Sequence, residues 1–87
     1  MYYVYALQSL KNKNWLYIGS SENLRARFDE HTSGKVISTA KYRPLRLVYY
    51  EAFLNKKDAT LREYQLKHNS QQKEQLKLKL INSLQAE

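Results

Sequence analysis

The chain of 87 residues contains no cysteine, and no apolar segment is long enough to span a bilayer. Without cysteine, the protein can form neither a disulfide nor a thiolate metal site. A membrane-spanning helix needs about 20 apolar residues, so the sequence predicts no membrane association of that kind. The first residues, MYYVYALQS, lack a basic leader and a small-residue cleavage pattern. This absence predicts no signal peptide and is compatible with a cytoplasmic location.

Acidic residues are also scarce, with eight Asp and Glu against fifteen Lys and Arg, which gives a net charge of +7. The excess is spread along the chain, because residues 1–43 carry +4 and residues 44–87 carry +3. A positive field of this size favours polyanionic partners, of which nucleic acid is the commonest in a cell. On charge alone, a plain solvated basic surface is an equally good interpretation.

Two aromatic-rich segments predict an antiparallel hairpin at the start of the chain. They are residues 2–9 and 15–19, and the polar turn 11–14 joins them. Alternation places Val4, Ala6, Leu16 and Ile18 on a face that suits a core. It places Tyr3, Tyr5, Tyr17 and Gly19 on the other face. Gly19 is expected to let the chain turn tightly after the second strand.

The remainder predicts three helices and one more strand. A helix is expected over residues 22–33, with Ser20 or Ser21 as its N-cap. Gly34 is expected to end this helix as a cap in the left-handed backbone conformation. Residues 35–44 are expected to be irregular up to the break at Pro44. A strand over 45–53, a helix from the Asn55 cap to about His68 and a last helix capped by Ser70 complete the chain. Its apolar stripe is Leu76, Leu80, Ile81 and Leu84. The predicted order is β-β-α-β-α-α, in a single domain over residues 1–87, with a core over about 2–69 and the last helix over about 70–84.

Three polar side chains stand out on the first two predicted helices. Arg27 and His31 lie one turn apart, on a helix face rotated away from the stripe of Leu24 and Phe28. They can therefore line a cleft beside the tyrosine face of the hairpin. The alternative is an ordinary solvated helix face with an exposed histidine. Glu63, on the next helix, is likewise open to two interpretations, as a ligand or as a surface residue.

Taken together, two tyrosines, an arginine, a histidine and one carboxylate suit the hydrolysis of a phosphodiester bond. An arginine offers a charged fork to the scissile phosphate. One carboxylate can hold a Mg²⁺ ion that keeps most of its water ligands. A tyrosine can take a proton from the attacking water if nearby positive charge lowers its pKa from the usual value of about 10.

The ordered set of motifs resembles the GIY-YIG nuclease superfamily. In particular, the motif set is similar to that of the small single-domain bacterial members of this superfamily and to that of the catalytic domain of the excision-repair incision subunit. YVY at 3–5 matches the first signature element, and YIG at 17–19 matches the second. NLRARFDEH resembles the helix of the catalytic arginine, which lies ten positions after the signature tyrosine. ATLREYQLK resembles the helix of the metal-binding glutamate. The resemblance covers about residues 2–69.

This resemblance implies an α/β (α+β) fold in which helices flank a small three-stranded antiparallel sheet. It also implies a DNA endonuclease that depends on Mg²⁺ or Mn²⁺ and acts in DNA repair or processing. Carried onto this chain, it implies that Tyr17 is the general base and that Tyr5 positions the phosphate or the water. Arg27 would stabilise the transition state, His31 would assist proton transfer or orient Tyr5, and Glu63 would bind the metal.

The chain also departs from the family pattern. Tyr3 replaces the first signature glycine, and Ser20 stands where many repair-type relatives have a lysine that helps to deprotonate the tyrosine. Lys35 or Lys41 could supply that charge instead. No specificity domain is attached, so a protein partner is expected to supply substrate targeting.

Two alternatives to the nuclease remain open at this point. One is a non-catalytic nucleic-acid-binding domain that retains the fold. The other is an interaction domain that uses the C-terminal leucine stripe, although such stripes more often pack on their own domain.

Overall fold

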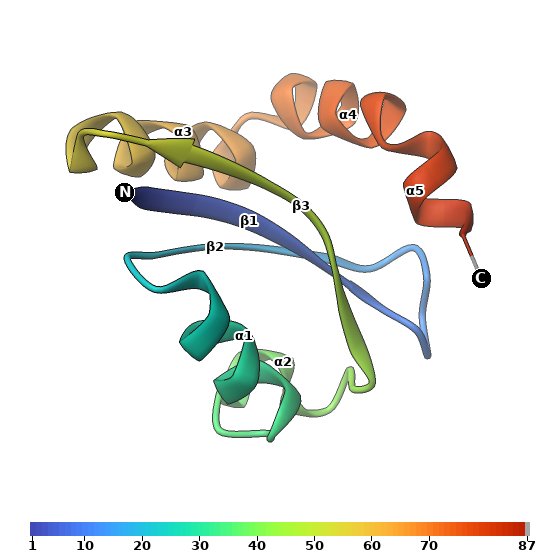
Figure 1. The fold of residues 1–87 in the computed structure, drawn as a ribbon. Helices are drawn as coiled ribbons and strands as arrows, with labels where there is room; N and C mark the ends of the chain where they lie inside the picture. The colour runs from blue at the N-terminus through green and yellow to red at the C-terminus, as the bar shows by residue number, and fades with distance from the viewer. Residues whose placement is uncertain (87) are drawn as a thin grey trace.

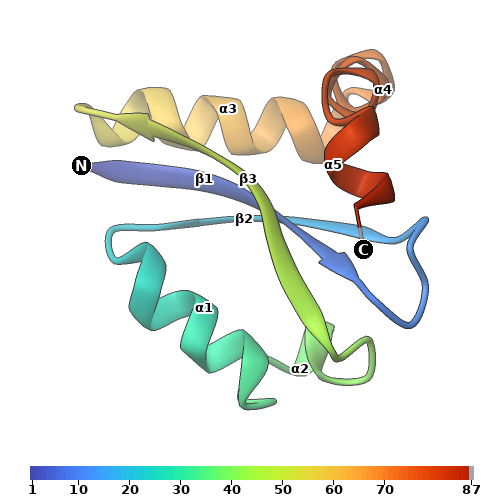
Figure 2. The same ribbon diagram turned by 45° about the vertical axis from the view of Figure 1, so that its right-hand side comes forward.

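The computed structural model describes residues 1–86 and contains a three-stranded antiparallel sheet with helices on both faces (Figure 1). The central strand β1 (Tyr2–Ser9) pairs with β2 (Leu16–Ser21) on one side and with β3 (Leu45–Phe53) on the other. One face carries α1 (Leu24–Thr32) and α2 (Ile37–Ala40). The opposite face carries α3 (Lys56–His68), α4 (Ser70–Lys79) and α5 (Ile81–Gln85), as Figure 2 also shows. The α+β class and the antiparallel sheet expected from the sequence are therefore confirmed. Within residues 1–86, no helix combines the length and the apolar character needed to cross a membrane.

The hairpin register sorts the side chains of β1 and β2 as their alternation predicts. Tyr5 pairs with Gly19, and Leu7 pairs with Tyr17. The side chains of Tyr5, Leu7 and Tyr17 join an apolar cluster on the α1 face. The other face forms a second cluster, which consists of Val4, Ala6, Ile18, Ala59, Leu66, Leu76 and Leu80. Strand β1 thus separates two apolar layers, and this explains why six of its eight residues are buried.

Gly19 does not form the tight turn that the sequence analysis predicted. Strand β2 runs on through Ser21, and the only glycine with a positive φ among residues 1–86 is Gly34, at +83°. A Cβ atom at Gly19 would overlap the hydroxyl of Tyr5 on the paired strand. Glycine is needed here because a tyrosine ring crosses the backbone at this point.

The helix boundaries agree closely with the sequence in one helix and less closely in another. Asn55 caps α3 by accepting a hydrogen bond from the Lys57 backbone N–H at 2.8 Å, and α3 ends at His68, as expected. Helix α1 begins at Leu24, because Asn23 and not a serine caps it, with 3.1 Å between Asn23 Oδ1 and Ala26 N.

The C-terminal region forms two helices where the sequence predicted one. Asn69 rather than Ser70 caps α4. The helix is interrupted at Leu80, which ends α4 and precedes α5. Leu76 and Leu80 are buried in the core cluster, whereas Ile81 is 49% exposed. The leucine stripe therefore packs on its own sheet, so it no longer supports a separate interaction domain.

A buried polar side chain ties α5 to the sheet. Gln8 on β1 is fully buried, and its Nε2 donates to the Leu84 carbonyl oxygen at 2.9 Å. Its Oε1 accepts from Nε of Arg46 at 2.7 Å, and Arg46 also donates to the Ser83 carbonyl oxygen at 3.2 Å. Because each of these groups has a partner, the end of the chain is held without an unsatisfied buried donor.

Candidate active site

The edge strand β2 brings the predicted site residues together from both faces of the sheet. Tyr17 lies on β2 itself, and its ring centroid is 5.3 Å from that of His31 on α1. The Tyr5 ring is 5.6 Å from His31 by the same measure. From the opposite face, Glu63 on α3 reaches Ser20 of β2. Helices α1 and α3 thus both contact the edge strand β2, from opposite faces of the sheet, which no local sequence pattern shows.

A buried hydrogen-bonded chain runs from Tyr5 through His31 to Thr39. The Tyr5 hydroxyl lies 2.7 Å from His31 Nε2, and His31 Nδ1 lies 2.8 Å from Thr39 Oγ1. The Thr39 hydroxyl also lies 3.4 Å from the Val36 carbonyl oxygen, to which it donates. This pattern assigns the proton of the imidazole to Nδ1 and leaves Nε2 to accept from the Tyr5 hydroxyl.

His31 is not the exposed histidine that the alternative interpretation of α1 expected, because its exposed fraction is 0%. Burial lowers its pKa below the usual value of 6.5, and the positive charge of Arg27 lowers it further. The imidazole is therefore neutral near pH 7 and can accept a proton at Nε2. Helix α2, which the sequence analysis took as irregular, supplies the Thr39 hydroxyl that completes this environment.

Tyr5 is held in its protonated form. Burial raises the pKa of Tyr5 to about 12, although the neighbouring Arg27 guanidinium opposes this rise. Its exposed fraction is only 1%. Its ring lies against Gly19, and its hydroxyl is directed to His31, so both its position and its proton are fixed by neighbours.

Arg27 is a partly exposed cation on the α1 side of the site. Its side chain is 36% exposed, and Nη1 lies 3.2 Å from Oε1 of Glu30. The Tyr5 hydroxyl and the Glu30 carboxylate both raise its already high pKa, so the guanidinium stays charged. A pair on one exposed helix turn is worth about 0.3–0.5 kcal/mol, so Glu30 can readily give way to an anionic ligand.

Glu63 has a partner on each carboxylate oxygen. Oε1 accepts from the Ser20 hydroxyl at 2.8 Å, and Oε2 lies 2.9 Å from Lys67 Nζ. The same ammonium lies 5.7 Å from the centre of the Tyr17 ring. Sequence reasoning overlooked Lys67, although its place four residues after Glu63 on a helix was a visible signal. Lys41 was considered in the sequence analysis as the positive charge that helps to deprotonate Tyr17. It lies instead over the Tyr42 ring.

Glu63 offers one carboxylate that could hold a divalent ion. Among residues 1–86, no three His, Asp or Glu side chains gather into a cluster that could hold a metal. A site with one carboxylate suits Mg²⁺, which usually keeps several waters and binds substrate phosphates. The cation beside this carboxylate in the structure is the Lys67 ammonium.

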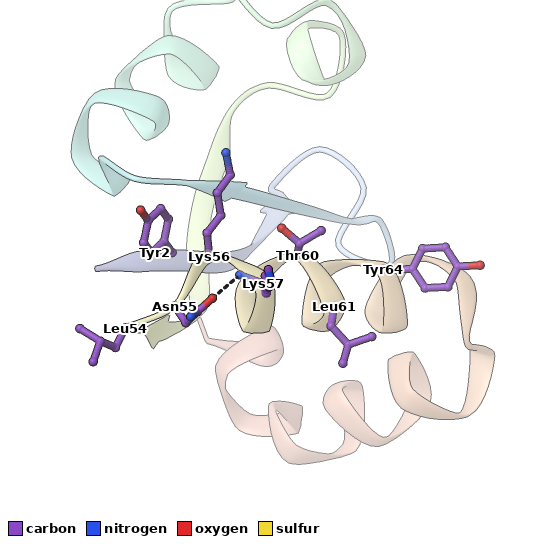
Figure 3. Close-up of a pocket in the computed structure, with 8 residues that line it drawn as sticks. All are labelled: Tyr2, Leu54, Asn55, Lys56, Lys57, Thr60, Leu61 and Tyr64. Atoms are coloured by element: carbon purple, nitrogen blue, oxygen red, sulfur yellow. Dashed lines mark hydrogen bonds between the residues drawn. The ribbon is translucent and has the colours of Figure 1, made fainter.

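A shallow groove continues from this site along α3 (Figure 3). A hollow beside Ser20 is lined by Tyr2, Lys56 and Thr60, and these three residues also line the groove. In Figure 3, the Lys56 side chain extends away from α3 towards the side of the molecule that carries α1. Tyr64 lines the groove farther along the helix and is 62% exposed.

Comparison with known proteins places the chain in a family. The family model described as the GIY-YIG catalytic domain matches residues 1–77. A UPF0213 protein of Staphylococcus haemolyticus is 41% identical over 81 residues, which cover 92% of this chain and 93% of that protein. A UPF0213 protein of Clostridium perfringens is 39% identical over 84 residues, covering 95% of this chain and 85% of that protein. The solution structure of a UPF0213 protein of Bacillus halodurans superposes with a TM-score of 0.55 at 35% identity, covering 92% of this chain and 85% of that one. The chain therefore belongs to the GIY-YIG catalytic domain family.

Proposed function

We propose that this protein is a divalent-metal-dependent endonuclease that hydrolyses phosphodiester bonds in DNA. The observation that carries the proposal is the arrangement around β2, where a partly exposed guanidinium, a tyrosine and a buried tyrosine–histidine pair lie on one face and one carboxylate reaches the strand from the other. Membership of a nuclease-like family supports the same chemistry. A role in DNA repair or processing in the cytoplasm, with a partner protein that supplies targeting, is part of this proposal.

Binding of the scissile phosphate is assigned to Arg27 and to a metal at Glu63. The Arg27 guanidinium offers planar, permanently charged donors, which match phosphate oxygens and the extra charge of the transition state. Glu63 would hold Mg²⁺ or Mn²⁺, and such an ion supplies charge stabilisation at the phosphate. The basic groove side chains of Lys56 and Lys57 then hold the flanking backbone.

Proton transfer is assigned to the tyrosines. Tyr17 is partly exposed and lies beside the Lys67 ammonium. After releasing its own hydroxyl proton to solvent, its phenolate would accept a proton from the attacking water. In this assignment, Tyr5 stays protonated, and with His31 it holds the phosphate or the water in position. A second candidate for the base is Tyr5 itself, because His31 Nε2 can receive the Tyr5 proton as Tyr5 takes one from water.

A specific observation favours a second function, which is nucleic-acid binding without catalysis. Ser20 replaces the lysine of many repair-type relatives, and its hydroxyl occupies one oxygen of Glu63. Lys67 occupies the other oxygen. A pure binding module, however, gains nothing from a carboxylate that faces phosphate. The nuclease is therefore the better-supported proposal.

A cleavage assay on labelled single-stranded, duplex, flap and junction DNA tests the proposal. We expect cuts in at least one of these substrates with Mg²⁺ or Mn²⁺ present, and none after chelation. Binding of the same substrates without any cleavage in either metal would favour the non-catalytic function instead.

A further inference from the structure

We propose that Lys67 is a built-in counter-ion of Glu63, which divalent metal must displace in order to bind. The inference concerns a positioning residue and rests on the proposed function, because it takes Glu63 as the metal ligand. It assigns Lys67 a role that weakens metal binding when no DNA is present.

The first support is the geometry of the carboxylate. Lys67 Nζ lies 2.9 Å from Oε2 of Glu63, while Ser20 Oγ lies 2.8 Å from Oε1. Glu63 is one helical turn before Lys67, the favourable order for such a pair along a helix. The exposed fraction of the Glu63 side chain is only 23%, and each of its two oxygens already has a protein partner. An ammonium and a metal ion cannot both contact the same carboxylate oxygen at bonding distance.

The second support is that Lys67 has a contact besides the one with Glu63. Its ammonium is 5.7 Å from the centre of the Tyr17 ring, within the range of a cation–π contact. The side chain itself is 39% exposed, so its end is free to turn. A DNA phosphate held at Arg27 would offer the ammonium an anionic partner in place of Glu63.

The consequence is a coupling between the two ligands. When phosphate attracts Lys67 away from Glu63, the carboxylate becomes free for metal, so DNA should tighten metal binding. By thermodynamic reciprocity, metal should then tighten DNA binding by the same factor. The free protein would bind metal weakly, and the complex with DNA would bind it more tightly.

The direct test is the dissociation constant for Mn²⁺ without DNA, measured by calorimetry on the parent and on Lys67→Met. Methionine keeps an unbranched apolar stem beside Tyr17 and removes the charge. The matched control is Lys77→Met, which breaks an exposed Lys77–Glu74 pair on α4, away from the site. Glu63→Gln combined with Lys67→Met reports binding elsewhere on the protein, and circular dichroism reports folding.

We expect Lys67→Met to bind Mn²⁺ at least about five-fold more tightly than the parent, with no change in Lys77→Met. The double variant should lose this site. Equal or weaker Mn²⁺ affinity in Lys67→Met would overturn the role of Lys67 while leaving the nuclease proposal intact. If neither the parent nor Lys67→Met binds Mn²⁺ at millimolar concentration, the metal role of Glu63 fails, and the counter-ion role fails with it.

Discussion

His31 is the residue that connects Tyr5 on β1 to Thr39 on α2. Its imidazole accepts from the Tyr5 hydroxyl on one nitrogen and donates to Thr39 on the other, and it is fully buried. A neutral, fully hydrogen-bonded imidazole can be buried at low cost, whereas a charged one cannot. The same feature that positions Tyr5 therefore makes the fold sensitive to acid.

That sensitivity can be measured as stability against pH. The folded-state pKa of His31 is lowered, so over the pH range just below 6.5 the unfolded chain takes up a proton that the folded protein does not. The free energy of unfolding should fall across this range, by at most about 1.4 kcal/mol per pH unit. Urea denaturation at several pH values checks this. His31→Gln should flatten the dependence, and a parent profile that is already flat would contradict the buried neutral imidazole.

Tyr17→Phe tests the assignment of the base. The variant keeps the ring between Trp15 and His31, so folding should change little. The cleavage rate should fall by about 10²-fold or more, because the hydroxyl that accepts the proton is lost. Single-turnover cleavage rates of the parent, Tyr17→Phe and Tyr5→Phe, measured side by side, check this. A rate near the parent for Tyr17→Phe, with a large loss for Tyr5→Phe, would transfer the role of base to Tyr5.

Among the secondary-structure elements, α4 and α5 most need a test, because their packing decided against a separate interaction surface. Leu76 is 2% exposed in the core cluster, whereas Ile81 is 49% exposed on the same predicted stripe. Leu76→Ala should lower the free energy of unfolding by about 2–4 kcal/mol. Ile81→Ala should lower it by less than about 1 kcal/mol. Denaturant unfolding compares the two, and equal small losses would show that α4 is not part of the core.

Local patterns predicted most of these elements. The strand over 45–53, the Asn55 cap and the end of α3 at His68 follow from alternation, capping chemistry and charge, which are local properties. The four-residue helix α2 and the break at Leu80 could not be predicted, because a short helix leaves little periodicity.

The candidate site was only partly predictable for a related reason. Arg27, His31 and Glu63 were found through motif spacing, but spacing does not report burial. The burial of His31 depends on Thr39 from α2, and the pairing of Glu63 with Ser20 depends on how α3 meets β2. Both are contacts between distant segments, which a single sequence does not reveal.

At the scale of the whole molecule, the net charge of +7 predicts salt-dependent binding to DNA. Each phosphate neutralised on duplex DNA adds about 0.9 to the slope of log affinity against log salt. Fluorescence anisotropy between 50 and 200 mM salt measures that slope, and Lys56→Ala in the groove should reduce it by about 1. Lys77→Ala on α4 serves as the control. Affinity that does not change with salt would contradict electrostatic recognition of the backbone.

The most direct test of the account is cleavage and DNA affinity measured together in Glu63→Ala. The side chain is partly exposed, and its partners Ser20 and Lys67 are exposed, so the variant should fold like the parent. With Mg²⁺, it should not cut DNA, because the carboxylate proposed to hold the metal is gone. It should still bind DNA at least as tightly as the parent, because a negative charge is removed and the ammonium of Lys67 is released. Cleavage by Glu63→Ala at the parental rate in Mg²⁺ would contradict the proposed metal site, and with it the nuclease mechanism.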